Sequence, residues 1–140
     1  MQALYEGSEL LDRAAFSQAR TELGANFVRI LGYFREDGEK SVAQIEEATR
    51  SQNATALVIP AHTLKGESRQ FGADLLGDLA ETIEMIGRDC IERHDEPIEA
   101  IEHVAKLRPL FTATLDMLDR EANPLVARKP VFGRRPTSMG

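Results

Sequence analysis

The 140-residue sequence contains one cysteine, at position 90, and no long apolar run. A single cysteine cannot form an internal disulfide, which favours a reducing compartment. A membrane-spanning helix needs about 20 consecutive apolar residues, and a signal peptide needs a charged segment followed by an apolar one. The sequence has neither pattern, so we expect a cytoplasmic protein with no membrane contact.

Motifs for several kinds of chemistry are also missing. The sequence has no serine or cysteine nucleophile arranged with a base, no paired carboxylates at a cleft, and no histidine–cysteine spacing typical of a metal site. It also lacks a glycine-rich phosphate loop and the protein-kinase motifs. We therefore expect no metal site, no cofactor of its own and no ATP site.

Charge is distributed unevenly along the chain. The whole sequence has 17 Lys and Arg against 23 Asp and Glu, a formal net charge of −6. Residues 122–140 hold four of the basic residues and no acidic one, so residues 1–121 carry a net charge of −10. An acidic body of this kind does not favour nucleic acid as a partner.

Apolar residues recur at steps of three and four, as in amphipathic helices, and no segment alternates like a strand. Asp12 is a suitable N-cap for a short helix that ends near residue 23, and Asn53 for a helix that ends near residue 71. Further helices are predicted over residues 21–51, 73–94 and 97–121. Gly38 leaves open a break in the first of these three.

These helices predict an all-α fold, an antiparallel up-and-down four-helix bundle with a short additional N-terminal helix. We assign the bundle to residues 1–121. The core candidates of its last helix are Ile98, Ile101, Val104, Ala105, Leu107, Phe111, Leu115 and Leu118. Residues 122–140 form a basic tail that contains proline and glycine. Its Val131–Phe132 pair leaves two alternatives open, docking on the bundle or a partner, or a disordered terminus.

The helix predicted to start after Asn53 carries a histidine on its polar side. At about 100° per residue, His62 points about 140–180° away from the apolar stripe formed by Leu57 and Leu64. The side chains on the His62 side are Val58, Ile59, Lys65, Gly66 and Arg69. The helix therefore presents an imidazole, two cations and a gap to solvent.

This arrangement favours phosphoryl chemistry. A surface histidine is largely neutral near pH 7, so its free ring nitrogen can act as a nucleophile. Lys65 is close enough to interact with an oxyanion at His62, and Gly66 removes a side chain that would shield the ring. Val58 and Ile59 give the face an apolar part that suits protein docking. Without a nucleotide site, such a histidine fits a residue that accepts a phosphoryl group from a partner.

Residues 62–84 resemble the pattern of histidine-containing phosphotransfer (HPt) domains, His-x-Leu-Lys-Gly-x-Ser followed by Gly-Ala, two leucines and a glutamate. The matching residues are His62, Leu64, Lys65, Gly66, Ser68, Gly72, Ala73, Leu76, Leu79 and Glu84. The predicted bundle agrees with this resemblance independently.

The resemblance implies that His62 is phosphorylated, normally at Nε2, and exchanges the phosphoryl group with aspartates of response-regulator receiver domains. It implies that Lys65 stabilises the phosphoryl group, that Gly66 admits the receiver, and that the receiver supplies Mg²⁺. The protein would then be a monomeric phosphoryl carrier, not an enzyme, with a hybrid histidine kinase upstream. Arg69 lies outside the motif; from its position we predict that it contacts the partner, as do Val58 and Ile59.

Other functions stay open at this point. A bundle could bind a receiver or kinase without carrying phosphate, or serve as a helical adaptor whose basic tail docks elsewhere. His62 together with Lys65 favours the phosphorelay intermediate over both. The chain could also be a segment of a larger hybrid kinase, although Met1 close to the first helix favours an independent protein.

Overall fold

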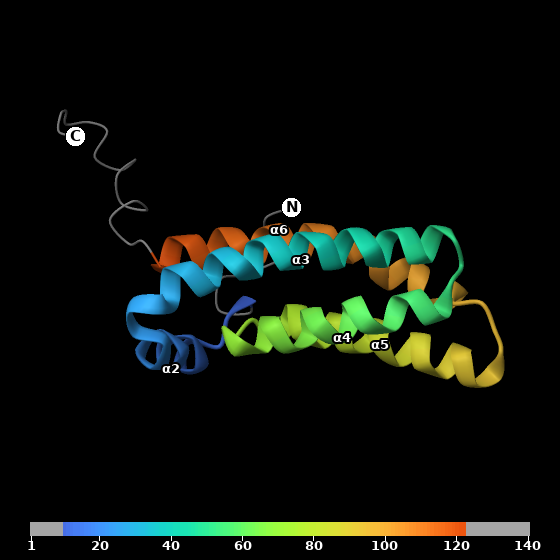
Figure 1. Cartoon of the computed structure of the whole chain (residues 1–140), viewed down its shortest axis with the longest axis horizontal. Coiled ribbons are helices and arrows are strands. Elements are labelled where there is room, and N and C mark those ends of the chain that lie inside the picture. Colours follow the sequence, from blue (N-terminus) through green and yellow to red (C-terminus); the bar gives the residue numbers. More distant parts are fainter. Residues whose placement is uncertain (1–9, 123–140) are drawn as a thin grey trace, which may run out of the picture.

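A computed structural model describes residues 10–122, and every regular element in this range is a helix (Figure 1). The elements in chain order are α2 (Arg13–Leu23), the 3₁₀ turn η2 (Gly24–Asn26), α3 (Phe27–Arg50), α4 (Ala54–Gln70), α5 (Asp74–Arg93), the 3₁₀ turn η3 (Ile98–Ala100) and α6 (Ile101–Ala122). The Val131–Phe132 alternatives lie outside the described residues. The domain division near residue 121 stays a prediction.

The four long helices form an antiparallel bundle. In Figure 1, α3 and α6 run side by side in one layer, α4 and α5 in the other, and α2 covers one end. This confirms the predicted all-α bundle with a short additional N-terminal helix. None of the helices within residues 10–122 is long and apolar enough to span a membrane.

Capping side chains begin α2 and α4 where the sequence predicts. Oδ1 of Asp12 accepts a hydrogen bond from the Ala15 backbone N–H at 3.1 Å, and Oδ1 of Asn53 accepts one from Ala56 at the same distance. The predicted start of the long helix at residue 21 is wrong. Gly24 has φ +53°, so a 3₁₀ turn separates α2 from α3, which starts at Phe27.

Hydrogen bonds join α2 and its N-cap to two other parts of the bundle, the turn between α4 and α5 and the end of α6. The backbone N–H of Asp12 donates to the carbonyl of Gly72, in the turn between α4 and α5, at 2.8 Å. The Arg20 guanidinium donates to the carbonyls of Glu121 and Ala122, at 2.8 and 3.3 Å. These bonds satisfy carbonyls that the end of α6 leaves without a helical partner.

The core is mostly aliphatic and contains a continuous row of five phenylalanine rings. Neighbouring ring centroids lie 5.4–6.0 Å apart in the order Phe16, Phe27, Phe71, Phe34 and Phe111. These edge-to-face and tilted pairs add to the burial of apolar area, which is the main stabilising term for such a bundle.

The buried side of the last helix differs from the prediction at three residues. Ile98 and Ile101 are 59% and 50% exposed, and Ala105 is also exposed, so their placement in the core is wrong. Helix α6 begins only at Ile101, and its buried stripe runs through Val104 and Leu107. At about 100° per residue, Ile101 and Ala105 point away from that stripe.

Gly38 lies inside an unbroken α3, so the break that the sequence left open is absent. A Cβ at this position would lie only 2.6 Å from Cε1 of Phe111, a ring that is 2% exposed. The glycine therefore lets α6 approach α3 closely, which outweighs its poor helix propensity.

We expect Gly38→Ala to lower the free energy of unfolding by about 1–3 kcal/mol, because the new methyl group overpacks against Phe111. Gly32→Ala is the matched control in the same helix, since a Cβ there has nothing within 4 Å. The control should gain up to about 1 kcal/mol from helix propensity. Urea unfolding of both variants measures the difference, and equal stabilisation would contradict the close packing.

Candidate functional site

His62 lies in the middle of α4, and its side chain is 58% exposed. Leu57 and Leu64 are fully buried on the other side of the same helix. The sequence prediction that the imidazole faces outward is therefore confirmed by the geometry.

One ring nitrogen of His62 is held by a buried carboxylate. Nδ1 lies 3.1 Å from Oε2 of Glu84 on α5, whose side chain is 4% exposed. An ionised carboxylate can only accept hydrogen bonds, so Nδ1 carries the hydrogen. In the neutral ring this leaves Nε2 without a proton and with a free lone pair.

Two cations share the same carboxylate. Nζ of Lys65 lies 2.8 Å from Oε1 of Glu84, and Arg88 reaches Oε2 with Nη2 at 2.8 Å and Nε at 2.9 Å. Burial alone would raise the pKa of Glu84, but the hydrogen bonds from Lys65, Arg88 and His62 outweigh it and lower the pKa to about 2. The carboxylate is thus ionised near neutral pH, beside two cations that leave a net positive charge next to the ring.

Glu84 and Arg88 are the site residues whose roles the sequence analysis did not identify. Glu84 entered only as the last residue of the matching pattern, and Arg88 did not enter at all. Their spacing of four residues on α5 favours an ion pair between them. The sequence did not show, however, that this part of α5 lies beside His62.

The face around His62 differs in part from its prediction. Ile59 is 70% exposed, and a Cβ at Gly66 would have nothing within 4 Å, so both lie open beside the ring. Val58 is only 7% exposed, so the expectation that it faces a partner is wrong. Its Cγ2 would lie 3.1 Å from a Cβ at Gly87, which shows that it packs against α5 where that helix comes closest.

Arg69 bridges α4 and α5. Its Nη2 lies 2.8 Å from Oδ1 of Asp78 and 2.7 Å from Oε1 of Glu81, and its Cγ would lie 2.9 Å from a Cβ at Gly77. The Arg69 side chain is 39% exposed, so it could still be reached by a partner while it pairs with Asp78 and Glu81. Its contact with a partner stays a prediction.

The rest of the motif builds the α4–α5 hairpin. Ser68, Ala73 and Leu76 are fully buried, and Gly72 has φ +76°, which a side chain would strain. A Cβ at Gly72 would also lie 2.8 Å from the carbonyl of Asp12. Within residues 10–122, no group of three or more histidine, cysteine, aspartate or glutamate side chains is placed to hold a metal ion.

Comparison with known proteins agrees with this geometry. The family model for the Hpt domain matches residues 29–122, more than half of the chain. The structure is also similar to histidine-containing phosphotransfer protein B (HptB) from Pseudomonas aeruginosa PAO1, with a TM-score of 0.70 and 21% identity over 80% of this chain and 93% of that one. The comparison with curated proteins gave no match.

An exposed histidine on a helical bundle, together with the family match, defines the class of a histidine phosphotransfer protein. The chain belongs to the Hpt domain family, and the resemblance noted in the sequence is confirmed. Proteins of this family carry phosphoryl groups in two-component signalling and work with receiver domains and histidine kinases; they are not kinases themselves.

We expect acid to destabilise the fold through Glu84. Its pKa is lowered from the ordinary 4.5 to about 2, so its stabilising contribution is present above pH 4.5 and is lost as the pH falls through about 2. A shift of this size corresponds to about 3 kcal/mol. Denaturant unfolding between about pH 6 and pH 2 should show this loss in the native chain and not in Glu84→Gln.

Glu92→Gln is the matched control, because Glu92 is exposed on the same helix. This control should keep the acid-dependent loss. An identical pH dependence in the native chain and in Glu84→Gln would contradict the buried ion pairs.

Proposed function

We propose that the chain is a phosphorelay intermediate in which Nε2 of His62 accepts a phosphoryl group from a receiver aspartate and passes it to another receiver. The observation that carries this proposal is the exposed imidazole whose Nδ1 lies 3.1 Å from the buried carboxylate of Glu84. That contact supports Nε2 as the nitrogen with the free lone pair.

The transfer needs no reactant other than this protein and the receiver, because each bond that forms is matched by one that breaks. The Nε2 lone pair attacks the phosphorus of the aspartyl phosphate, a nitrogen–phosphorus bond forms, and the aspartate leaves with the electrons of the broken phosphorus–oxygen bond. The Nδ1 proton stays between the ring and Glu84, whose negative charge stabilises the positive charge that develops on the imidazole. The reverse steps return the phosphoryl group to a receiver.

The cations of the site have separate tasks in this proposal. Lys65 has three N–H donors, and its contact with Glu84 at 2.8 Å leaves donors for an oxygen of the phosphoryl group on His62. Arg88 helps to keep Glu84 ionised and in position. In this proposal the receiver supplies Mg²⁺, since residues 10–122 hold no group of three or more histidine, cysteine, aspartate or glutamate side chains placed for a metal ion.

The docking face for the receiver lies around the ring. Ile59 and Met85 are 70% and 48% exposed, one on each helix of the hairpin, and Gly66 leaves open space between partner and ring. Arg69 lies on the same helix as His62 and extends the face towards Asp78 and Glu81. A hybrid histidine kinase upstream, a cytoplasmic location and a monomeric state complete the proposal.

We expect His62→Gln to fold normally and to lose phosphoryl acceptance from a phosphorylated receiver, because glutamine has no nucleophilic ring nitrogen. His103→Gln, which removes a histidine from α6, should keep full acceptance. The assay follows acid-labile, base-stable label after incubation with a phosphorylated receiver, with circular dichroism as the check on folding. Undiminished labelling of His62→Gln would refute the assignment.

The same assay tests the adaptor function. A native chain that binds the phosphorylated receiver but takes up no label would favour an adaptor that does not carry phosphate.

We expect Gly66→Leu to keep the bundle and to slow transfer at least about tenfold, the equivalent of about 1.4 kcal/mol of lost docking energy. The added side chain would enter open space in the free protein, so only the approach of a partner is blocked. Gly32→Leu is the matched control, because Gly32 is also a helical glycine with open space around it. Equal transfer rates in the two variants would contradict the docking face.

A further inference from the structure

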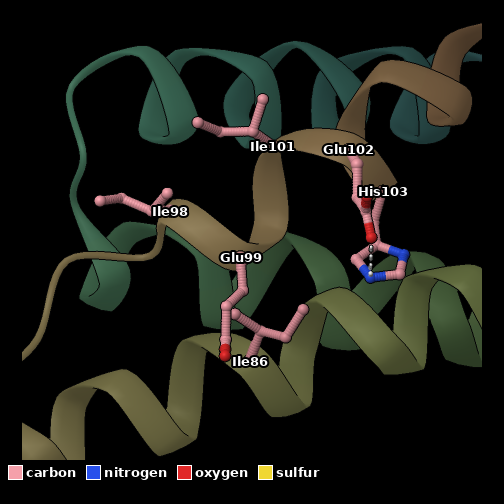
Figure 2. A pocket seen from close by; sticks show the side chains of 6 residues that line it. All are labelled: Ile86, Ile98, Glu99, Ile101, Glu102 and His103. Atoms are coloured by element: carbon pink, nitrogen blue, oxygen red, sulfur yellow. Dashed lines mark ion pairs between the residues drawn. The ribbon is translucent and has the colours of Figure 1, made fainter.

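A pocket lined by three isoleucines and three polar side chains lies at the opposite side of α5 from the histidine. It is an open hollow of about 600 Å³ between α5 and the start of α6, and we call it the α5–α6 pocket. Figure 2 shows the residues that line it, Ile86, Ile98, Glu99, Ile101, Glu102 and His103. Ile98 and Ile101 are 59% and 50% exposed, which is unusual for two isoleucines side by side on a bundle surface.

The rim of this pocket is acidic. Residues 95–102 contain four acidic side chains, and residues 94–105 contain no lysine or arginine. Arg93 offsets part of this charge, with Nε 3.0 Å from Asp95 and Nη2 3.9 Å from Glu99. Glu102 is 78% exposed at its side chain, and its one ion-pair contact among residues 10–122 is with His103 at 3.8 Å. The pocket therefore suits an apolar segment flanked by cations.

The chain itself contains such a segment in its tail. Residues 128–135 read Arg-Lys-Pro-Val-Phe-Gly-Arg-Arg, with all four cations of the tail around one apolar pair. We propose that this segment docks in the α5–α6 pocket of its own chain, with Val131 and Phe132 against Ile98 and Ile101. The flanking arginines then pair with the acidic rim, so both the apolar and the charged parts match.

The length of the tail sets the conformation that this placement requires. Ala122 ends α6 at the far end of the bundle from the pocket (Figure 1). The helix from Ile101 to Ala122 spans about 33 Å at about 1.5 Å per residue. Ten residues of chain, from Ala122 to Phe132, extend to about 33–36 Å at most. Phe132 therefore reaches the level of Ile101 only when the tail turns back directly after Ala122 and runs almost fully extended along α6.

This docking leaves the histidine site open. The pocket is lined by α5, η3 and α6, whereas His62 lies on α4 and meets α5 at Glu84. Ile86 is two residues from Glu84, about 200° around the helix. Phosphoryl acceptance at His62 therefore stays independent of the tail, and each proposal can fail without the other.

The test uses the full chain with ¹³C-labelled isoleucine methyl groups. In Phe132→Ala we expect the Ile98 and Ile101 methyl resonances to move, because the ring current of Phe132 is lost, while the exposed Ile59 methyl stays in place. Met139→Ala, a substitution in the same tail outside the segment, should move none of them. Unmoved Ile98 and Ile101 resonances in Phe132→Ala would overturn the proposal.

A charge exchange tests the acidic rim. Arg134→Glu with Arg135→Glu should move the Ile98 and Ile101 methyl resonances as Phe132→Ala does. Adding Glu99→Arg and Glu102→Arg to that variant should restore the native positions. A failure of the second pair to restore them would contradict pairing between rim and tail.

A dilution series shows whether the segment in the pocket comes from the same chain or from a second copy. Resonance positions that do not depend on protein concentration support docking within one chain. Positions that move on dilution assign the segment to a second copy and overturn the proposal.

Discussion

The buried carboxylate of Glu84 is the interaction on which the site depends. It lies between the ring of His62 and the cations of Lys65 and Arg88, at contact distances of 2.8–3.1 Å. An unpaired charge at 4% exposure would be costly, so Glu84 needs these donors to stay ionised. In return, the carboxylate orients the ring and keeps Lys65 beside it. The structure of the site and the phosphoryl transfer proposed for it therefore rest on the same four side chains.

Packing between α4 and α5 brings these side chains together. Gly87 and Gly77 let Val58 and the stem of Arg69 lie close against α5, which shortens the distance between the helices on both sides of His62. The turn at Gly72 joins the two helices and is held by the backbone of Asp12. The hairpin is thus positioned by glycines at which a side chain would collide with the neighbouring element.

Much of this was predictable from the sequence because it depends on helical period and local capping. The exposure of His62, the caps at Asp12 and Asn53, and the four-helix order follow from patterns within single helices. Contacts between helices were not predictable in this way. The ion pairs of Glu84 and the burial of Val58 depend on which helix faces which, and at what height along the bundle, and one sequence does not contain that register.

The two hydrogen bonds from Arg20 to the carbonyls at residues 121 and 122 have a consequence for the chain beyond α6. They join the first and last described helices at one place, so the exit point of the C-terminal segment is set by a side chain from the N-terminal helix. Loss of α2 would release that exit point while leaving the histidine and its carboxylate on their own pair of helices. The position of the last turn of α6 is therefore held by a side chain about a hundred residues earlier in the sequence, the arginine at position 20.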